Sequence, residues 1–136
     1  MKVKAVLESC LYGDDLEAAE VFYTEVLGLE VYKKTPGRHV FFQLEKGMFL
    51  FFNPERTRQI PPADAKFRVP AHGVAGEGHL AFSMDAKDYD HWKNRLIGNG
   101  VEIESEVDWP AGGRSIYFRD PAGNSLELAM ASIWGQ

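Results

Sequence analysis

GHLAFSM, residues 78–84, alternates large apolar side chains with small or polar ones, a pattern typical of a strand buried on one face. The segment DAKDYDHWKNRLIGNG follows and places Tyr, Trp and Leu at helical spacing, with glycines at its end. Three further strands are predicted, the last two joined by a PAGN turn: VEIESEV (101–107), RSIYFRD (114–120) and SLELAM (125–130). The predicted order is therefore strand–helix–strand–strand–strand.

The first half of the chain repeats this order. The strand AVLESCLY lies within residues 3–12, and Asp14 or Asp15 is predicted to cap the helix that ends at Gly28. Three strands follow: LEVYKK (29–34), HVFFQL (39–44) and MFLFF (48–52). We therefore predict an α+β fold in which one domain, 1–136, holds two βαβββ modules. Module one spans about 1–53, a connecting loop about 54–77 and module two about 78–131. Each module has one helix for its sheet, so we expect the other sheet face to close on a partner sheet.

Composition narrows the classes of function. The chain has 45% hydrophobic and 26% charged residues and a net charge of −5, which argues against a nucleic-acid partner. No apolar run approaches the ~18 residues of a membrane span, and the first residues lack the apolar region of a secretion signal. A single cysteine excludes an intrachain disulfide. We expect a cytoplasmic protein that binds neither membrane nor nucleic acid.

Three ligand-type side chains lie at comparable places in the predicted strands. Glu8 and His79 each stand seven residues before the equivalent of their helix start, and Glu127 lies in the last strand. Small residues flank His79 and Glu127 on their strand face, which leaves room for a cavity. Two carboxylates and an imidazole suit a divalent ion such as Mn, Fe, Co, Ni or Zn, whose charge offsets the burial of the carboxylates.

Each of these residues also has an ordinary interpretation. A lone strand histidine is often a hydrogen-bonded core residue, and a lone strand glutamate often faces solvent at an edge. Glu127 could also pair with Arg114 or Arg119. The repeat and the matching strand faces favour one shared site.

The motifs DLEAAEVFYTEVLGLEV, GHLAFSM and YFRDPAGNSLELA resemble the vicinal oxygen chelate superfamily. Its members include glyoxalase I, fosfomycin-resistance thiol transferases, extradiol dioxygenases, methylmalonyl-CoA epimerases and bleomycin-resistance proteins. The resemblance implies paired βαβββ modules curled around a metal, with Glu8, His79 and Glu127 as ligands. It also implies that a fourth ligand, present in some members, is missing here, because Phe49 or Phe51 occupies its place.

The resemblance implies a metal-dependent enzyme of the glyoxalase type. The metal would chelate a small oxygen-rich substrate, and Glu8 or Glu127 would serve as general base in lyase or isomerase chemistry. Thiol transfer and dioxygenation are alternatives, and a metal-free binding protein of the bleomycin-resistance kind is another. A homodimer is expected in every case, with the modules paired within a chain or swapped between chains.

Further residues are candidate contacts to the substrate. Cys10 shares the strand face of Glu8, although it could instead be a small buried thiol that fills space. Trp109 lies in a loop that borders the pocket in similar proteins. His72, on the long loop, is ambiguous between a ligand contact and a solvated position. The full set of predicted substrate contacts is Cys10, Trp109, Arg114, Tyr117 and Arg119.

Overall fold

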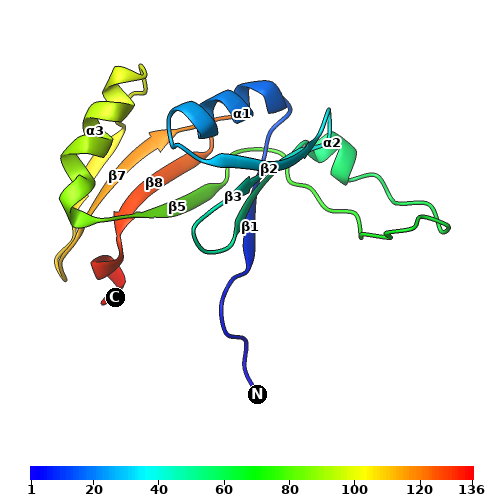
Figure 1. Cartoon of the computed structure of the whole chain (residues 1–136), viewed down its shortest axis with the longest axis horizontal. Coiled ribbons are helices and arrows are strands. Elements are labelled where there is room, and N and C mark those ends of the chain that lie inside the picture. The colour runs from blue at the N-terminus through cyan, green and yellow to red at the C-terminus, as the bar shows by residue number, and fades with distance from the viewer. The chain divides into compact units, whose positions relative to one another are not determined.

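The computed structural model describes all residues, 1–136, and divides them into two compact units, Met1–Gly76 and Glu77–Gln136. The loop that connects the predicted modules belongs mostly to the first unit. Each unit holds one four-stranded mixed sheet and one longer helix (Figure 1), so the predicted order of elements is confirmed twice. No helix in either unit combines the length and the apolar character needed to cross a membrane.

The first unit has the strand order β1-β4-β3-β2, with β1 parallel to β4 and the other pairs antiparallel. Its elements are β1 (Glu8–Tyr12), α1 (Leu16–Glu25), β2 (Glu30–Thr35), β3 (His39–Gln43), β4 (Met48–Phe52) and the short α2 (Pro54–Thr57). Asp15 is the N-cap of α1, since its side chain accepts from the Ala18 N–H at 3.0 Å. Gly28 follows the helix with a φ of 71°, the predicted left-handed conformation.

Helix α1 covers one face of this sheet and closes an aromatic core around Tyr23, which is fully buried. The Tyr23 ring lies 4.7 Å from that of Phe49 and 5.5 Å from that of Phe42. The opposite face carries the alternate residues of each strand, among them Glu8, Cys10 and Tyr12 of β1. The period-2 pattern thus separates a helix-covered face from a face that carries polar groups.

Two strand boundaries differ from the prediction. β1 begins at Glu8 rather than Val3, because its partner β4 begins at Met48. Residues 45–47, just before Met48, form a bend and offer no strand for residues 3–7 to pair with. Residues 1–7 extend away from the sheet (Figure 1). β6 begins at Ser105 rather than Val101, because the Val101 N–H still bonds the Leu96 carbonyl at the end of helix α3.

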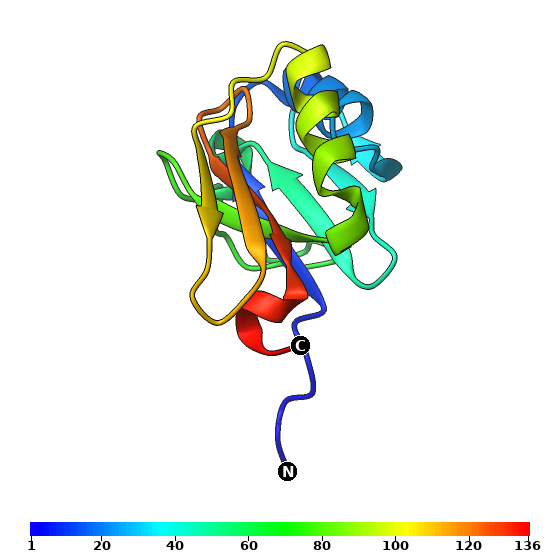
Figure 2. The ribbon, with the colours of Figure 1, turned by 90° about the vertical axis from the view of Figure 1, so that its left-hand side faces the viewer.

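The second unit repeats the topology with the order β5-β8-β7-β6. Its elements are β5 (His79–Met84), the 3₁₀ turn η1 (Ala86–Asp88), α3 (Tyr89–Gly98), β6 (Ser105–Asp108), β7 (Arg114–Arg119), β8 (Ser125–Met130) and η2 (Ala131–Trp134). Helix α3 runs alongside the sheet (Figure 2). Ile116, Phe118 and Leu126 have no exposed surface and form the core, so β7 turns its other face, with Tyr117, away from them.

Candidate metal centre

His79 and Glu127 converge on one face of the second sheet. β5 and β8 are parallel neighbours in which His79 pairs with Ser125 and Ala81 with Glu127. His79 Nε2 and Glu127 Oε2 lie 3.3 Å apart. The glutamate side chain is 7% exposed, whereas that of the histidine is 52% exposed. The pair therefore joins a buried carboxylate to an imidazole that reaches solvent.

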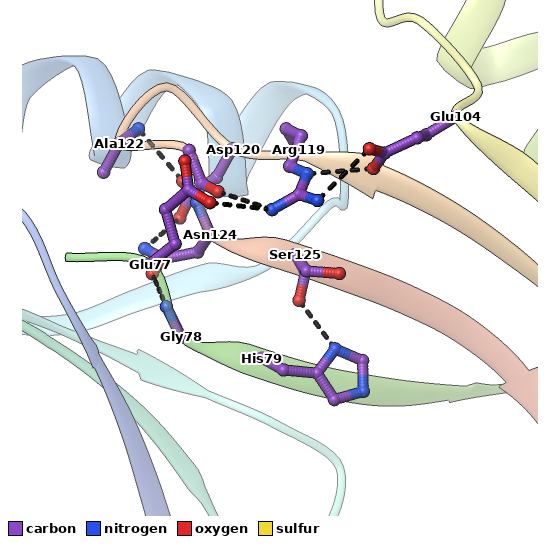
Figure 3. A network of polar contacts seen from close by, with 10 residues as sticks. Glu77, Gly78, His79, Glu104, Arg119, Asp120, Ala122, Asn124 and Ser125 are labelled. Atoms are coloured by element: carbon purple, nitrogen blue, oxygen red, sulfur yellow. Dashed lines mark hydrogen bonds and ion pairs between the residues drawn. The ribbon is translucent and has the colours of Figure 1, made fainter.

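The orientation of the His79 ring follows from its other nitrogen. Nδ1 lies 2.9 Å from the Ser125 carbonyl oxygen, as Figure 3 shows. A carbonyl only accepts hydrogen bonds, so Nδ1 carries a proton and the ring is turned with Nε2 toward Glu127. Metal-binding histidines are usually held in this way by a carbonyl or carboxylate behind the ring.

The second carboxylate oxygen of Glu127 is bound by a buried serine. Ser115 has no exposed surface, and its Oγ donates to Glu127 Oε1 at 2.5 Å. The indole Nε1 of Trp109 donates in turn to Ser115 Oγ at 2.8 Å. Trp109 was predicted from its loop, whereas Ser115 was missed, although it stands two residues before Tyr117 on the same strand face.

Tyr117 completes this group of side chains. It pairs with Glu127 across β7 and β8, and its ring lies 6.3 Å from the His79 ring at an interplanar angle of 25°. Burial, followed by the charge of Glu127 and a hydrogen bond to it, raises the pKa of Tyr117. The phenol is therefore protonated at neutral pH and can donate a hydrogen bond.

The donor geometry of the pair fits a divalent metal. Two nitrogen or oxygen ligands on one such ion stand about 2.9–3.4 Å apart at octahedral or tetrahedral angles, and the measured separation is 3.3 Å. No three His, Cys, Asp or Glu side chains are grouped as a metal site in the structure. His79 and Glu127 thus form a two-donor group, and Glu8, at the start of β1, belongs to the first unit with an exposed side chain.

The two candidate arginines are engaged elsewhere. The Arg114 guanidinium binds Asp108 at 2.6 Å and lies 3.8 Å from the centre of the Tyr89 ring. Arg119 binds Glu104 at 2.9 Å and Glu77 at 3.3 Å (Figure 3). Neither arginine pairs with Glu127, so that alternative is wrong, and their contact with substrate stays a prediction.

Cys10 and His72 lie on the first unit. Cys10 is exposed, which corrects the interpretation of a buried thiol that fills space. Tyr12, on the same strand face, hydrogen bonds His72 Nδ1 at 2.7 Å and ties the long loop to β1. Burial, then a hydrogen bond with Cys10, raises the pKa of Tyr12 to about 12. His72 is therefore held against the sheet rather than solvated on a free loop.

A buried turn sets the position of His79; the sequence predicted the turn but not its contact with the start of β5. Asp120 Oδ1 accepts from the backbone N–H groups of Ala122 and Asn124, both at 2.9 Å. The Asn124 side chain donates to Asp120 Oδ2 at 2.9 Å and accepts from the Gly78 N–H at 2.7 Å (Figure 3). The turn between β7 and β8 thus fixes the residue just before His79. The DPAGN segment was the available signal, because Asp and Asn side chains commonly bond nearby backbone.

Comparison with known proteins places the chain in a family. The family model described as the Glyoxalase/Bleomycin resistance protein/Dioxygenase superfamily matches residues 5–128. The chain belongs to this superfamily. A crystal structure of lactoylglutathione lyase from Agrobacterium tumefaciens is 42% identical to it, with a TM-score of 0.92 and full coverage of both chains. The predicted resemblance and the α+β fold are confirmed.

Curated relatives of this glyoxalase-superfamily chain carry two kinds of name. The metallothiol transferase FosB of Bacillus licheniformis is 31% identical over 121 residues, which are 88% of this chain and 71% of that protein. The lactoylglutathione lyase of Salmonella typhimurium is 25% identical over 134 residues, which are 96% of each chain. Both names are those of enzymes, and they differ in the reaction.

The structure corrects the predicted place of the missing fourth ligand. Cys10 pairs with Leu50 in the first sheet as Ala81 pairs with Glu127 in the second. Leu50 is therefore the counterpart of Glu127, whereas Phe49 and Phe51 point into the core against α1. The conclusion that no metal ligand stands there is unchanged.

Proposed function

We propose that this glyoxalase-superfamily chain is a metal-dependent enzyme that acts on a small oxygen-rich substrate by lyase or isomerase chemistry. The observation that carries the proposal is the approach of His79 Nε2 and Glu127 Oε2, with the imidazole proton held on the far side by Ser125. The names of the relatives support it, since one is a lyase and the other a metallothiol transferase. Glu8 is the third proposed ligand.

The residues have distinct proposed roles. A metal held by Glu8, His79 and Glu127 would supply Lewis-acid stabilisation of a developing oxyanion. Glu8, which is exposed and has no buried partner, is the better placed carboxylate to take up a proton as general base. Tyr117 stays protonated and can donate to a substrate oxygen. Cys10, Trp109, Arg114 and Arg119 remain proposed substrate contacts.

Metal content tests the proposal directly. Purified protein, stripped with chelator and reloaded with Mn²⁺, Co²⁺, Ni²⁺ or Zn²⁺, should retain one ion per chain. A metal at 100 times its Kd should stabilise the fold by about 2.7 kcal/mol. E127Q and H79A should lose both effects. The matched controls E102Q and H91A change exposed residues of the same unit and should retain both metal binding and the stabilisation by metal. Equal metal binding by E127Q and E102Q would contradict the proposal.

Metallothiol transfer is the second candidate reaction, favoured by the 31% identity to FosB. The two reactions are separated by substrate. Metal-loaded protein should convert the hemithioacetal of methylglyoxal and glutathione if it is a lyase of the glyoxalase type. Addition of a thiol to fosfomycin, without that conversion, would favour the transferase instead.

The homodimer is part of the proposal, with Glu8 contributed by the same chain or by its partner. Mixing inactive E8A and H79A proteins under conditions of subunit exchange distinguishes the two arrangements. In a swapped dimer, each mixed dimer regains one intact site, so about a quarter of wild-type metal binding returns. No recovery is expected if each chain supplies all three ligands.

A further inference from the structure

We propose that Ser115 is a positioning residue that holds the Glu127 carboxylate in place for the metal, and that Trp109 orients the Ser115 hydroxyl. The inference rests on the proposed function of Glu127 as a ligand. It adds two residues, from β7 and from the loop before it, that do not contact the metal themselves. Their role follows from the direction of two hydrogen bonds and from the burial of these bonds.

The types of donor and acceptor set the direction of the two hydrogen bonds that join Trp109, Ser115 and Glu127. An indole Nε1–H can only donate, so at 2.8 Å the Ser115 oxygen accepts from Trp109. The single hydroxyl proton of Ser115 is then free to point at Glu127 Oε1, which lies 2.5 Å away. A bond this short between a hydroxyl and a carboxylate is typical of charge-assisted hydrogen bonds. Trp109, Ser115 and Glu127 therefore form a one-way chain that ends on the proposed ligand.

Burial prevents water from replacing the hydrogen bonds between Trp109, Ser115 and Glu127. Ser115 has no exposed surface and Glu127 is 5% exposed. Because Oε1 is occupied by the serine, Oε2, the oxygen facing His79, is the one available to a metal. Without the hydroxyl, the carboxylate would keep its hydrogen bond with Tyr117 but lose the one from Ser115, which leaves a buried oxygen with one donor fewer. Loss of such a supporting hydrogen bond typically weakens metal affinity by about 10–100-fold.

The loop that carries Trp109 is itself braced. The Trp109 N–H bonds the Gly113 carbonyl and the Gly112 N–H bonds the Trp109 carbonyl, each at 3.0 Å. Gly113 has a φ of 85°, and a Cβ there would come within 2.6 Å of Ser132 Oγ in η2. The indole is therefore presented to Ser115 by a tight turn packed on the last element of the chain. Trp109 as a whole remains 37% exposed, and its indole can report on the site.

The test compares S115A and W109F with S83A, which removes an exposed hydroxyl from β5 on the same sheet face. Ni²⁺ alone is titrated into each chelator-stripped protein by calorimetry. We expect S115A to bind Ni²⁺ about 10–100-fold more weakly than wild type and W109F about threefold to tenfold more weakly. S83A should bind like wild type. W109F changes a partly exposed ring and remains informative if S115A fails to fold.

A spectroscopic measurement separates positioning from simple stability. In ¹H–¹⁵N spectra recorded with diamagnetic Zn²⁺, the Trp109 indole resonance should move when the ion binds wild-type protein and in E127Q without metal, but it should not respond to Zn²⁺ in S115A. Wild-type affinity in both S115A and W109F would overturn this inference while leaving the proposed function intact. A wild-type protein that binds no Ni²⁺ would overturn both.

Discussion

Asn124 is expected to be one of the most sensitive positions in the second unit. Its amide joins the β7–β8 turn to the start of β5, accepting from the Gly78 N–H at 2.7 Å and donating to Asp120 Oδ2 at 2.9 Å. Asn124 is 1% exposed and Asp120 is 5% exposed. N124A therefore removes one hydrogen bond to a buried charge and one to the backbone beside His79.

The cost can be estimated from these two contacts. Loss of a partner from a buried polar group costs about 1–3 kcal/mol, with charged groups at the upper end. Gly78 is exposed and its N–H can be hydrated, so that contact falls at the low end. The Asp120 carboxylate retains its two backbone donors. We therefore expect N124A to lower the free energy of unfolding by about 2–3 kcal/mol.

Urea denaturation of metal-free protein, followed by circular dichroism, measures this difference. The matched control is N99A, which removes an exposed amide that bonds the Arg95 carbonyl at 2.8 Å and should change stability by less than about 0.5 kcal/mol. N124D keeps the acceptor for Gly78 but places a second carboxylate beside Asp120, so it should be no better than N124A. If N124A unfolds at the same urea concentration as N99A, the reasoning about this buried turn is refuted.

Three further predictions concern stability. Burial, then a hydrogen bond to a β6 carboxylate, raises the pKa of Tyr89 from 10.0 to about 12. Y89F should therefore lower the free energy of unfolding by about 1.5 kcal/mol at neutral pH. The difference between Y89F and wild type should disappear between about pH 10 and pH 12, because the stabilisation from the protonated Tyr89 phenol is lost over that range. G113A should be more destabilising in thermal melts than G112A, because both need positive φ but only Gly113 lacks space for a Cβ; equal melting temperatures would refute this. D15A should cost about 1 kcal/mol and D14A almost nothing, because only Asp15 caps α1; equal midpoints in urea would contradict that assignment.

Local signals in the sequence predicted most of the fold. The N-cap at Asp15 and the left-handed Gly28 depend on residues within one turn of the helix, so the pattern around them was sufficient. The strand limits depended on distant partners. The first residue of β1, Glu8, could not be predicted without knowing that its parallel neighbour β4 starts at Met48. Pairing register between separated strands is not encoded in either strand alone.

The candidate site was predicted to a similar extent. Alternation along β5 and β8 was enough to bring His79 and Glu127 to one face, because each strand was recognised in the right phase. Ser115 was not recognised because a serine in a strand carries no signal of its own. Its role arises only when Glu127 on the neighbouring strand and Trp109 from the loop meet it. The pairing of β1 with β4 showed that Leu50, and not a phenylalanine, occupies the place of the missing fourth ligand.

The two units contribute unequally to the proposed metal centre. In the second unit, Glu127 and His79 are held by Ser115 and by the Ser125 carbonyl before any metal binds. In the first unit, the counterpart of Glu127 is Leu50, which is apolar, and Glu8 is exposed. Preorganised donors lose little entropy on binding, whereas an unrestrained carboxylate must be ordered. E127Q should therefore cost more metal affinity than E8Q, and the reverse order in calorimetry would show that the first unit, not the second, organises the site.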